Sequence, residues 1–245
     1  MAHLHVIAGA EARPAHPTIR SITISDLFDA LARGWGDFSA MPSHALFLCL
    51  IYPVVAVFLA GVTMGYNILP LAYPLIAGFA LLGPIAAIGL YEMSRRREAG
   101  QEADPSHAFD VLRSPSLPAI GALGLLLLVI FLTWIGIAQQ IYQSLFGYLP
   151  PQSLPQFVST VFTTPEGWKL IMIGNAVGFV FAVVSFALSA ISFPLLLDRD
   201  VGLAAAITTS LRAITTNPVT MTAWGLIVAG LLLLGSLPFF IGLAV

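Results

Sequence analysis

The chain has 245 residues, of which 58% are hydrophobic and only 9% are charged, and its mean hydropathy is +0.92. Soluble domains carry roughly a quarter charged residues because their surfaces face water, so this composition excludes a protein surrounded by water on all sides. The formal net charge of −2 gives no support to nucleic acid as a partner.

Residues 1–20 are predicted to form a flexible cytoplasmic tail. Their apolar stretch, 6–10, is too short for the hydrophobic region of a signal peptide, and no basic segment precedes it. The remainder, residues 21–245, is expected to be a single transmembrane helical domain.

Five apolar segments are long enough to cross a bilayer, which takes roughly 20 residues. They lie at about 45–66, 69–91, 117–141, 167–197 and 219–235, and a shorter piece follows at 237–245. The interiors of these segments contain no Asp, Glu, Lys, Arg or His. Because apolar residues do not alternate along them, they are predicted to be helices rather than strands of a barrel. Pro84 and Pro194 lie late in their spans and should kink or end them.

The basic residues predict the orientation of the chain in the membrane. With a cytoplasmic N-terminus, Lys169 is the one Lys or Arg placed outside, and the other nine lie inside. Such a bias follows the positive-inside rule. We therefore expect a multi-pass protein of the bacterial inner membrane with its N-terminus in the cytoplasm.

A short amphipathic stretch precedes each odd-numbered span, at 22–42, 107–118 and 200–218. Thr23 and Asp26 have the spacing of a capping box at the start of the first, and Asp200 is placed to cap the third. The expected apolar face of the third stretch consists of Leu203, Ile207, Leu211 and Ile214. These helices either lie in the membrane interface with their apolar faces toward the acyl chains or pack under the bundle as a collar.

The fold class predicted is therefore an all-α, polytopic transmembrane bundle. Its unit, an amphipathic interfacial helix followed by a transmembrane hairpin, is expected to occur three times. The third copy breaks off at Val245, which leaves the sixth span truncated.

The spans lack the residues that intramembrane chemistry needs. The five histidines are His3, His5, His16, His44 and His107, and none lies in a span, where haem or copper would need ligands. The sequence also contains no hydrolase signature and no P-loop. We expect no catalytic residues, no metal and no cofactor.

Charged residues form a predicted cytoplasmic cluster at the ends of two spans. Glu92 is spaced to pair with Arg95 and Arg96 on one helix, and Asp198, Arg199 and Asp200 form a local charged turn. The cluster consists of Glu92, Arg95, Arg96, Arg97, Asp198 and Arg199.

Small residues line the span at 167–197 and allow another helix to approach closely. They are Gly174, Gly178, Ala182, Ser185 and Ser189, and they predict packing either within the chain or against a partner subunit.

In the same span, Asn175 makes either an interhelical hydrogen bond or part of a polar path. Aromatic residues near the span ends, Trp134 and Tyr142 among them, are interpreted as interfacial anchors.

Four segments resemble domain-of-unknown-function family 2189, and together the resemblance extends over about residues 25–245. They are GFALLGPIAAIGLYEMSRRREAG at 78–100, the Asp198-Arg199 pair within 193–200, SLRAITTNPVTM at 210–221 and DLFDALARGWGDFSAMP at 26–42. That family comprises prokaryotic integral membrane proteins, some of which are labelled cytochrome c oxidase subunits. Its members usually continue beyond the equivalent of Val245 with a histidine-containing ending.

Two functions remain open from the sequence. The first is a non-catalytic accessory or scaffold subunit of a larger inner-membrane complex, for which the resemblance implies a respiratory, cytochrome c oxidase type. The second is a small-solute transporter or channel built on the threefold repeat. The partners expected are the lipid bilayer and other membrane-protein subunits, with no nucleic acid.

Overall fold

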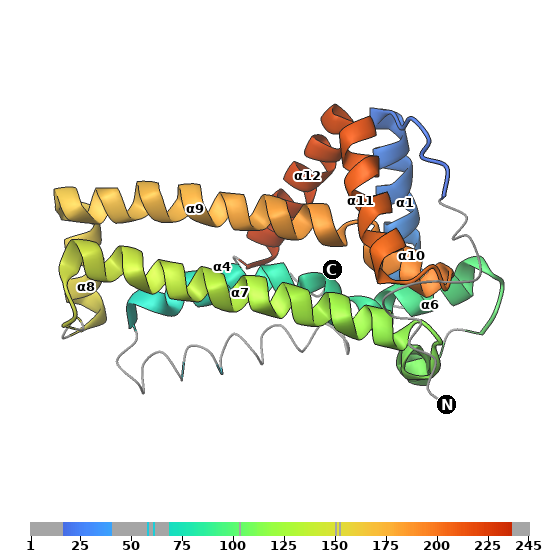
Figure 1. Cartoon of the computed structure of the whole chain (residues 1–245), viewed down its shortest axis with the longest axis horizontal. Helices are drawn as coiled ribbons and strands as arrows, with labels where there is room; N and C mark the ends of the chain where they lie inside the picture. Colours follow the sequence, from blue (N-terminus) through green and yellow to red (C-terminus); the bar gives the residue numbers. More distant parts are fainter. Residues whose placement is uncertain are drawn as a thin grey trace. The chain divides into compact units, whose positions relative to one another are not determined.

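The computed structural model describes residues 17–40, 58, 61, 69–102, 104–149, 151 and 153–236 (Figure 1). All regular elements in these ranges are helical, which confirms the all-α class for the described part of the chain. Apart from two isolated positions, the predicted span at 45–66 lies outside the described residues, as does the piece at 237–245. The threefold repeat needs both of them, and it stays a prediction.

Among the described residues, four helical segments are long and apolar enough to cross a membrane, by length and composition. They are Leu69–Glu98, Leu117–Phe146, Pro165–Asp198 and Pro218–Gly235, and they correspond to the second to fifth predicted spans. Two of them continue beyond the predicted ends, from 91 to Glu98 and from 141 to Phe146. Backbone hydrogen bonds continue a helix beyond its apolar stretch, so the helix is longer than the apolar segment from which the span was predicted.

The first of these spans is interrupted around Pro84, as predicted. It consists of η1 (Leu69–Leu71), α4 (Ala72–Phe79), η2 (Ala80–Leu82), α5 (Gly83–Ala86) and α6 (Ile88–Glu98). Proline has no N–H to donate and its ring clashes with the preceding turn, which accounts for the short 3-10 segment before it.

The span Pro165–Asp198 breaks between α9 (Pro165–Ser189) and α10 (Ser192–Asp198), shortly before Pro194. A serine from another element, Ser210, fills this break and is fully buried. Its hydroxyl donates to the Ala187 carbonyl at 2.8 Å and accepts from the Ile191 N–H at 3.3 Å. Two backbone groups left without helical partners are thus satisfied by one side chain.

The described residues fall into two compact units. The first contains 17–40, 84–102, 104–125 and 186–236, and the second contains 58, 61, 69–83, 126–149, 151 and 153–185. Each is described separately below.

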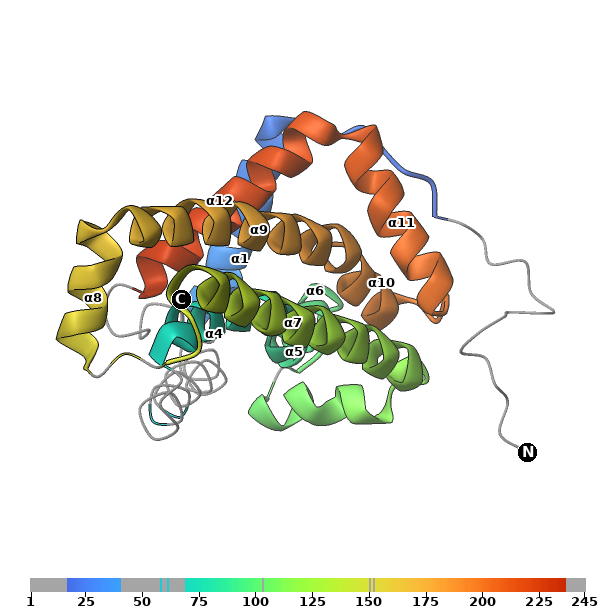
Figure 2. The same ribbon diagram turned by 60° about the vertical axis from the view of Figure 1, so that its left-hand side comes forward.

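In the second unit, α4 packs with the later part of α7 (Leu117–Phe146) and with α9, while α8 (Leu154–Thr163) lies at the ends of α7 and α9 (Figures 1 and 2). Its core contains Leu71, Trp134 and Ala138. The Trp134 indole N–H donates to the Pro74 carbonyl at 3.0 Å, and the side chain is only 4% exposed. The interpretation of Trp134 as an interfacial anchor is therefore wrong, because it is a core residue with a buried hydrogen-bond partner.

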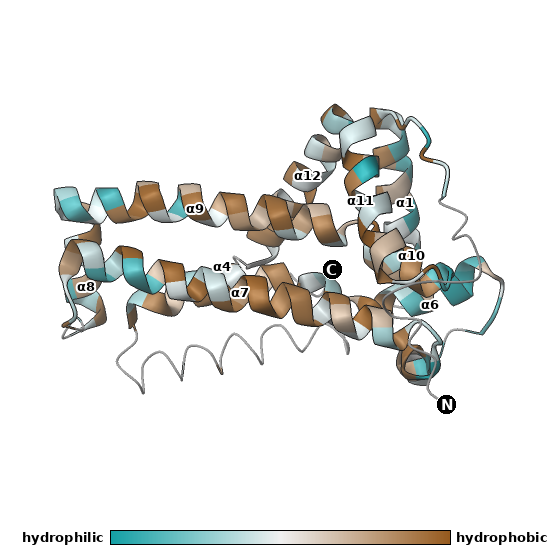
Figure 3. Ribbon diagram, in the orientation of Figure 1, coloured by the Kyte–Doolittle hydropathy of each residue, from teal (hydrophilic) through white to brown (hydrophobic). Residues whose placement is uncertain are grey.

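Figure 3 shows hydrophobic residues along most of α7 and α9. Many of the apolar side chains on these two helices are exposed, including Leu132 on α7 and Met172 and Phe179 on α9. Exposed apolar side chains over a whole helix are expected where lipid is the surrounding solvent. The distribution supports membrane insertion.

In the first unit, α1 (Ile24–Ala40) begins with the predicted contact between Thr23 and Asp26. The Asp26 carboxylate accepts from the Thr23 N–H at 2.6 Å and from its hydroxyl at 2.8 Å. Both hydrogen bonds favour the ionised form and lower the pKa of Asp26 below its ordinary value of 3.8. Apolar residues of α1, namely Ile24, Phe28 and Trp35, are exposed.

The helix α11 (Leu203–Thr216) differs from the prediction in two respects. Its N-cap is Gly202, with φ of 75°, rather than Asp200, and no side chain caps it. Its buried residues are Ala205, Ala206, Thr209 and Ser210, whereas Leu211 of the predicted apolar face is 40% exposed. Small side chains allow α11 to approach α10 closely. For α11, this packing favours the collar alternative.

Asn217 joins the start of the described chain to the junction of α11 and α12 (Pro218–Ser236). Its amide oxygen accepts from the Ile22 N–H at 2.9 Å, and its amide nitrogen donates to the carbonyls of Arg20 and Ala213. Thr220 adds a hydrogen bond to the Ile22 carbonyl at 3.0 Å. Asn217 is 7% exposed, so it is a buried polar link within the first unit.

Candidate functional site

The ends of three spans meet around a hollow of about 410 Å³ in the first unit. Its lining comes from the last turns of α6, from the end of η3 (Pro105–Arg113) with the stretch that leads to α7, and from the end of α10 with the segment that follows it. These are the C-terminal end of one span, the start of the next and the C-terminal end of the third. The predicted charge cluster lies here, apart from Arg97.

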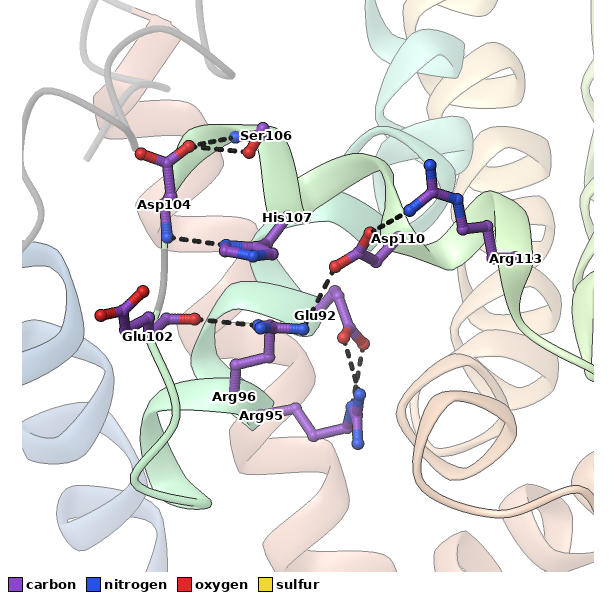
Figure 4. A network of polar contacts seen from close by, with 9 residues as sticks. All are labelled: Glu92, Arg95, Arg96, Glu102, Asp104, Ser106, His107, Asp110 and Arg113. Atoms are coloured by element: carbon purple, nitrogen blue, oxygen red, sulfur yellow. Dashed lines mark hydrogen bonds and ion pairs between the residues drawn. The ribbon is translucent and has the colours of Figure 1, made fainter.

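Glu92 is the most buried charged residue of this site, with 4% exposure. It forms a bidentate pair with Arg95, with Nε to Oε2 at 2.9 Å and Nη2 to Oε1 at 2.6 Å (Figure 4). The planar guanidinium matches the carboxylate in two parallel hydrogen bonds. The predicted pairing of Glu92 with Arg95 is confirmed.

Arg96 does not join this pair, contrary to the prediction from spacing. Its guanidinium pairs with Asp110 of η3 at 3.1 Å and donates to the Glu102 carbonyl at 2.9 Å (Figure 4). It therefore ties α6 to the chain segment that follows it. The two arginines lie at different angles around the helix, and η3 supplies a second acid on the Arg96 side.

The segment η3 is held at its start by a capping box that the sequence analysis did not recognise. The Asp104 carboxylate accepts from the Ser106 N–H at 3.0 Å, and the Asp104 N–H donates to Nδ1 of His107 at 3.0 Å (Figure 4). These bonds satisfy donors that have no partner at a helix start. His107 therefore has a structural role in placing Asp110.

The outer part of the hollow carries more exposed charges. The Arg113 side chain is 87% exposed and lies 3.6 Å from Asp110, while Arg199 and Asp198 pair at 3.1 Å with exposures of 65% and 60%. Asp200 accepts from the Ser116 hydroxyl at 3.5 Å. Ion pairs with this exposure contribute little to stability, because water and salt compete with them.

Arg97 faces a different neighbour, so the predicted cluster is divided. It pairs with Asp37 of α1, whose carboxylate also accepts from the Ser94 hydroxyl. This contact borders a second hollow of about 470 Å³ between α1 and α6. Arg97 therefore connects α1 to α6 instead of lining the first hollow.

Sequence reasoning missed Asp110 and Arg113 as members of the site, and it assigned Asp200 to a helix cap. A signal for the first two was present. Asp110 and Arg113 are three residues apart in a short segment with helical periodicity, on the same predicted side of the membrane as Glu92. What the sequence could not supply was the turn at Gly100, whose φ of 68° lets the chain fold back after α6.

The small residues of α9 divide between buried and open positions. A Cβ added to Gly178 would lie 3.1 Å from the Trp134 ring, so the close approach there is to a side chain of α7. Ser185 and Ser189 are buried, whereas Ala182 is exposed and Gly174 has nothing within 4 Å of a Cβ position. Part of the stripe packs inside the chain, and part of it is open.

Asn175 makes a hydrogen bond between helices, one of the two alternatives for this residue. Its amide oxygen accepts from the Tyr73 hydroxyl of α4 at 2.7 Å, and its amide nitrogen donates to the Ile171 carbonyl at 2.7 Å.

Within the part of the chain that the structure describes, no group of three or more His, Cys, Asp or Glu side chains is placed to hold a metal ion.

Comparison with known proteins gives one family. The family model described as "Predicted integral membrane protein (DUF2189)" matches residues 72–198, about half of the chain. This range runs from the start of α4 to the end of α10 and includes three of the four lining arginines. No curated protein and no solved structure matches the chain.

Proposed function

Because the chain belongs to the DUF2189 family of predicted integral membrane proteins, we propose that it is a non-catalytic accessory or scaffold subunit of a larger inner-membrane assembly. A respiratory assembly is the first class to test, since the family resemblance implies it. The N-terminus would lie in the cytoplasm, in keeping with the positive-inside bias.

The observation that carries this proposal is the open part of the small-residue stripe on α9. No atom lies within 4 Å of the position where a Gly174 side chain would begin and Ala182 is exposed, while apolar neighbours such as Phe179 are 67% exposed. Small residues on a membrane helix permit a second helix to approach closely and gain dispersion contacts. A helix of a partner subunit is therefore the occupant that we propose for this face.

The charged residues support the same proposal, because the pairs described above connect elements of the chain to one another. Arg96 with Asp110 joins α6 to η3, and Arg97 with Asp37 joins α6 to α1. Such pairs build a framework at the ends of the spans. A chain held together by such pairs, with exposed apolar side chains on its spans, can provide a stable surface for other membrane subunits.

The test is purification of the tagged full chain from its native membranes in a mild detergent. We expect a membrane protein to co-purify in a fixed ratio with the wild type and to be lost from the double variant Gly174→Leu, Ala182→Leu. Ala176→Leu, an exposed substitution on another side of α9, is the matched control and should keep the partner. A chain that is purified only as a monomer or homo-oligomer would overturn the proposal.

The transporter alternative relies on Asn175, whose amide already bonds Tyr73 and Ile171. Solute flux in proteoliposomes that depends on Asn175, lost in Asn175→Leu, would favour transport over the scaffold.

A further inference from the structure

The hollow at the ends of the three spans is lined by charges of both signs in equal number. Four arginines and four carboxylates border it, so their formal charges cancel. The remaining lining residues are small or aliphatic, such as Val111, Ser114 and Pro115. A ligand that carries a single net charge would leave this balance uncompensated.

The inner and outer charges differ in how firmly they are held. Glu92 and Arg96 have side chains only 5% and 20% exposed, and each has a well-formed partner. The outer residues Arg113, Arg199 and Asp198 are all at least 60% exposed. Because exposed pairs exchange readily with water and ions, the outer groups can take up an external ligand while the inner pairs keep the wall in place.

The position of the hollow along the spans indicates what it meets. Its lining lies at the end of the span Leu69–Glu98, just before Leu117 and at the end of the span that closes at Asp198. Span ends lie at the depth of lipid headgroups. The phosphate of a headgroup is the charged group that guanidinium binds best there, through paired hydrogen bonds.

From this balance and depth we infer that the hollow binds the headgroup of a zwitterionic phospholipid with a primary ammonium, that is, phosphoethanolamine chemistry. The phosphate is held by Arg113 and Arg199, and the ammonium is held by Asp198 and Asp200. A primary ammonium donates three hydrogen bonds to carboxylates, whereas a quaternary ammonium is recognised by aromatic faces, and the described residues that line the hollow include no aromatic side chain. The volume of about 410 Å³ is adequate for a headgroup.

The inference is independent of the proposed scaffold role, because it is tested on the chain purified by itself. The full chain is released from detergent in native mass spectrometry after incubation with equal amounts of phosphatidylethanolamine, phosphatidylcholine and phosphatidylglycerol. We expect the wild type to retain phosphatidylethanolamine preferentially. The double variant Arg113→Gln, Arg199→Gln should retain about a hundredfold less, because it loses two charge-assisted contacts and each corresponds to about tenfold in affinity.

Arg212→Gln is the matched control, since Arg212 is exposed on α11 and does not line the hollow. It should retain phosphatidylethanolamine like the wild type, and an unchanged melting temperature shows that each variant is folded. Preference for phosphatidylglycerol, no preference among the three lipids, or equal retention by the double variant would overturn the inference.

A competition arm separates recognition of the whole headgroup from recognition of phosphate alone. Soluble glycerophosphoethanolamine, a phosphodiester with the same neutral zwitterion as the lipid headgroup, should displace the lipid at concentrations at which inorganic phosphate does not. Equal displacement by inorganic phosphate would show that the ammonium is not bound, and this result would also overturn the inference.

Discussion

Gly78 of α4 has two aromatic rings against the position where a side chain would begin. An added Cβ would lie 2.8 Å from Phe131 and from Trp134, whereas nothing lies within 4 Å of the corresponding position at Gly174. Overpacking of a well-packed core costs about 1–3 kcal/mol, while alanine in place of glycine otherwise favours a helix by roughly 0.5–1 kcal/mol. We expect Gly78→Ala to lower the melting temperature of the purified chain and Gly174→Ala to keep or raise it.

A second variant separates the steric effect from other causes. If the rings are responsible, Phe131→Leu combined with Gly78→Ala should recover part of the lost melting temperature. Equal melting temperatures for the two single glycine variants would contradict the packing described for Trp134.

Asp26 provides a prediction about protonation at the start of α1. Its pKa is lowered because the Thr23 N–H and hydroxyl both donate to the carboxylate. The stabilisation of this helix start is therefore present above the unfolded pKa and is lost as the pH falls through the lower folded pKa. A carboxyl NMR titration should place Asp26 below 3.8 in the wild type.

In Thr23→Ala the hydroxyl donor is lost while the backbone donor remains, so the pKa of Asp26 should move part of the way back toward 3.8. An unchanged pKa in this variant would show that the side-chain hydrogen bond contributes nothing.

At the level of elements, the break between α9 and α10 depends on a residue of α11. Ser210→Ala leaves the Ile191 N–H and the Ala187 carbonyl without the partner they have in the structure, which costs about 1–3 kcal/mol for buried groups. We expect a lower melting temperature and faster amide exchange at 187–198. Thr208→Ala is the control, because Thr208 is exposed and bonds only within α11.

The sequence predicted an element correctly where one property of that segment alone determines it. Length and hydropathy located the four described spans, and Pro84 and Pro194 located the breaks. Prediction from the sequence failed where the contact between two elements determines which residues are buried. The buried face of α11 consists of small residues that no hydrophobic pattern marks, and Trp134 looked like an anchor because its partner, the Pro74 carbonyl, is 60 residues away.

The candidate site was predicted in the same partial way. Glu92 and Arg95 pair within one turn of helix, so their spacing was sufficient. Arg96 pairs with an acidic residue of η3 and Arg97 with one of α1. Which acidic residue each arginine meets depends on how the chain folds back after α6. Local pairs can thus be read from spacing, while pairs between elements cannot.

At the level of the whole molecule, orientation is the property still to be tested. Cys49 is the one cysteine of the chain, so Cys49→Ser provides a background for single labels. In intact cells, a membrane-impermeant maleimide should label Ser153→Cys, which is exposed before α8, and should label Gln101→Cys, exposed after α6, only after permeabilisation. The reverse pattern would invert the topology that the basic residues predict.

Ser210 also has a consequence for how the chain is made. The span that ends at Asp198 leaves the ribosome while residue 210 is still inside the exit tunnel, so the serine that closes the break is not yet accessible when this span reaches the bilayer. During that interval the Ile191 amide and the Ala187 carbonyl need water or continuous helix as a substitute. The bend between α9 and α10 in its final form therefore belongs to a late stage of biogenesis, after α11 has emerged and docked.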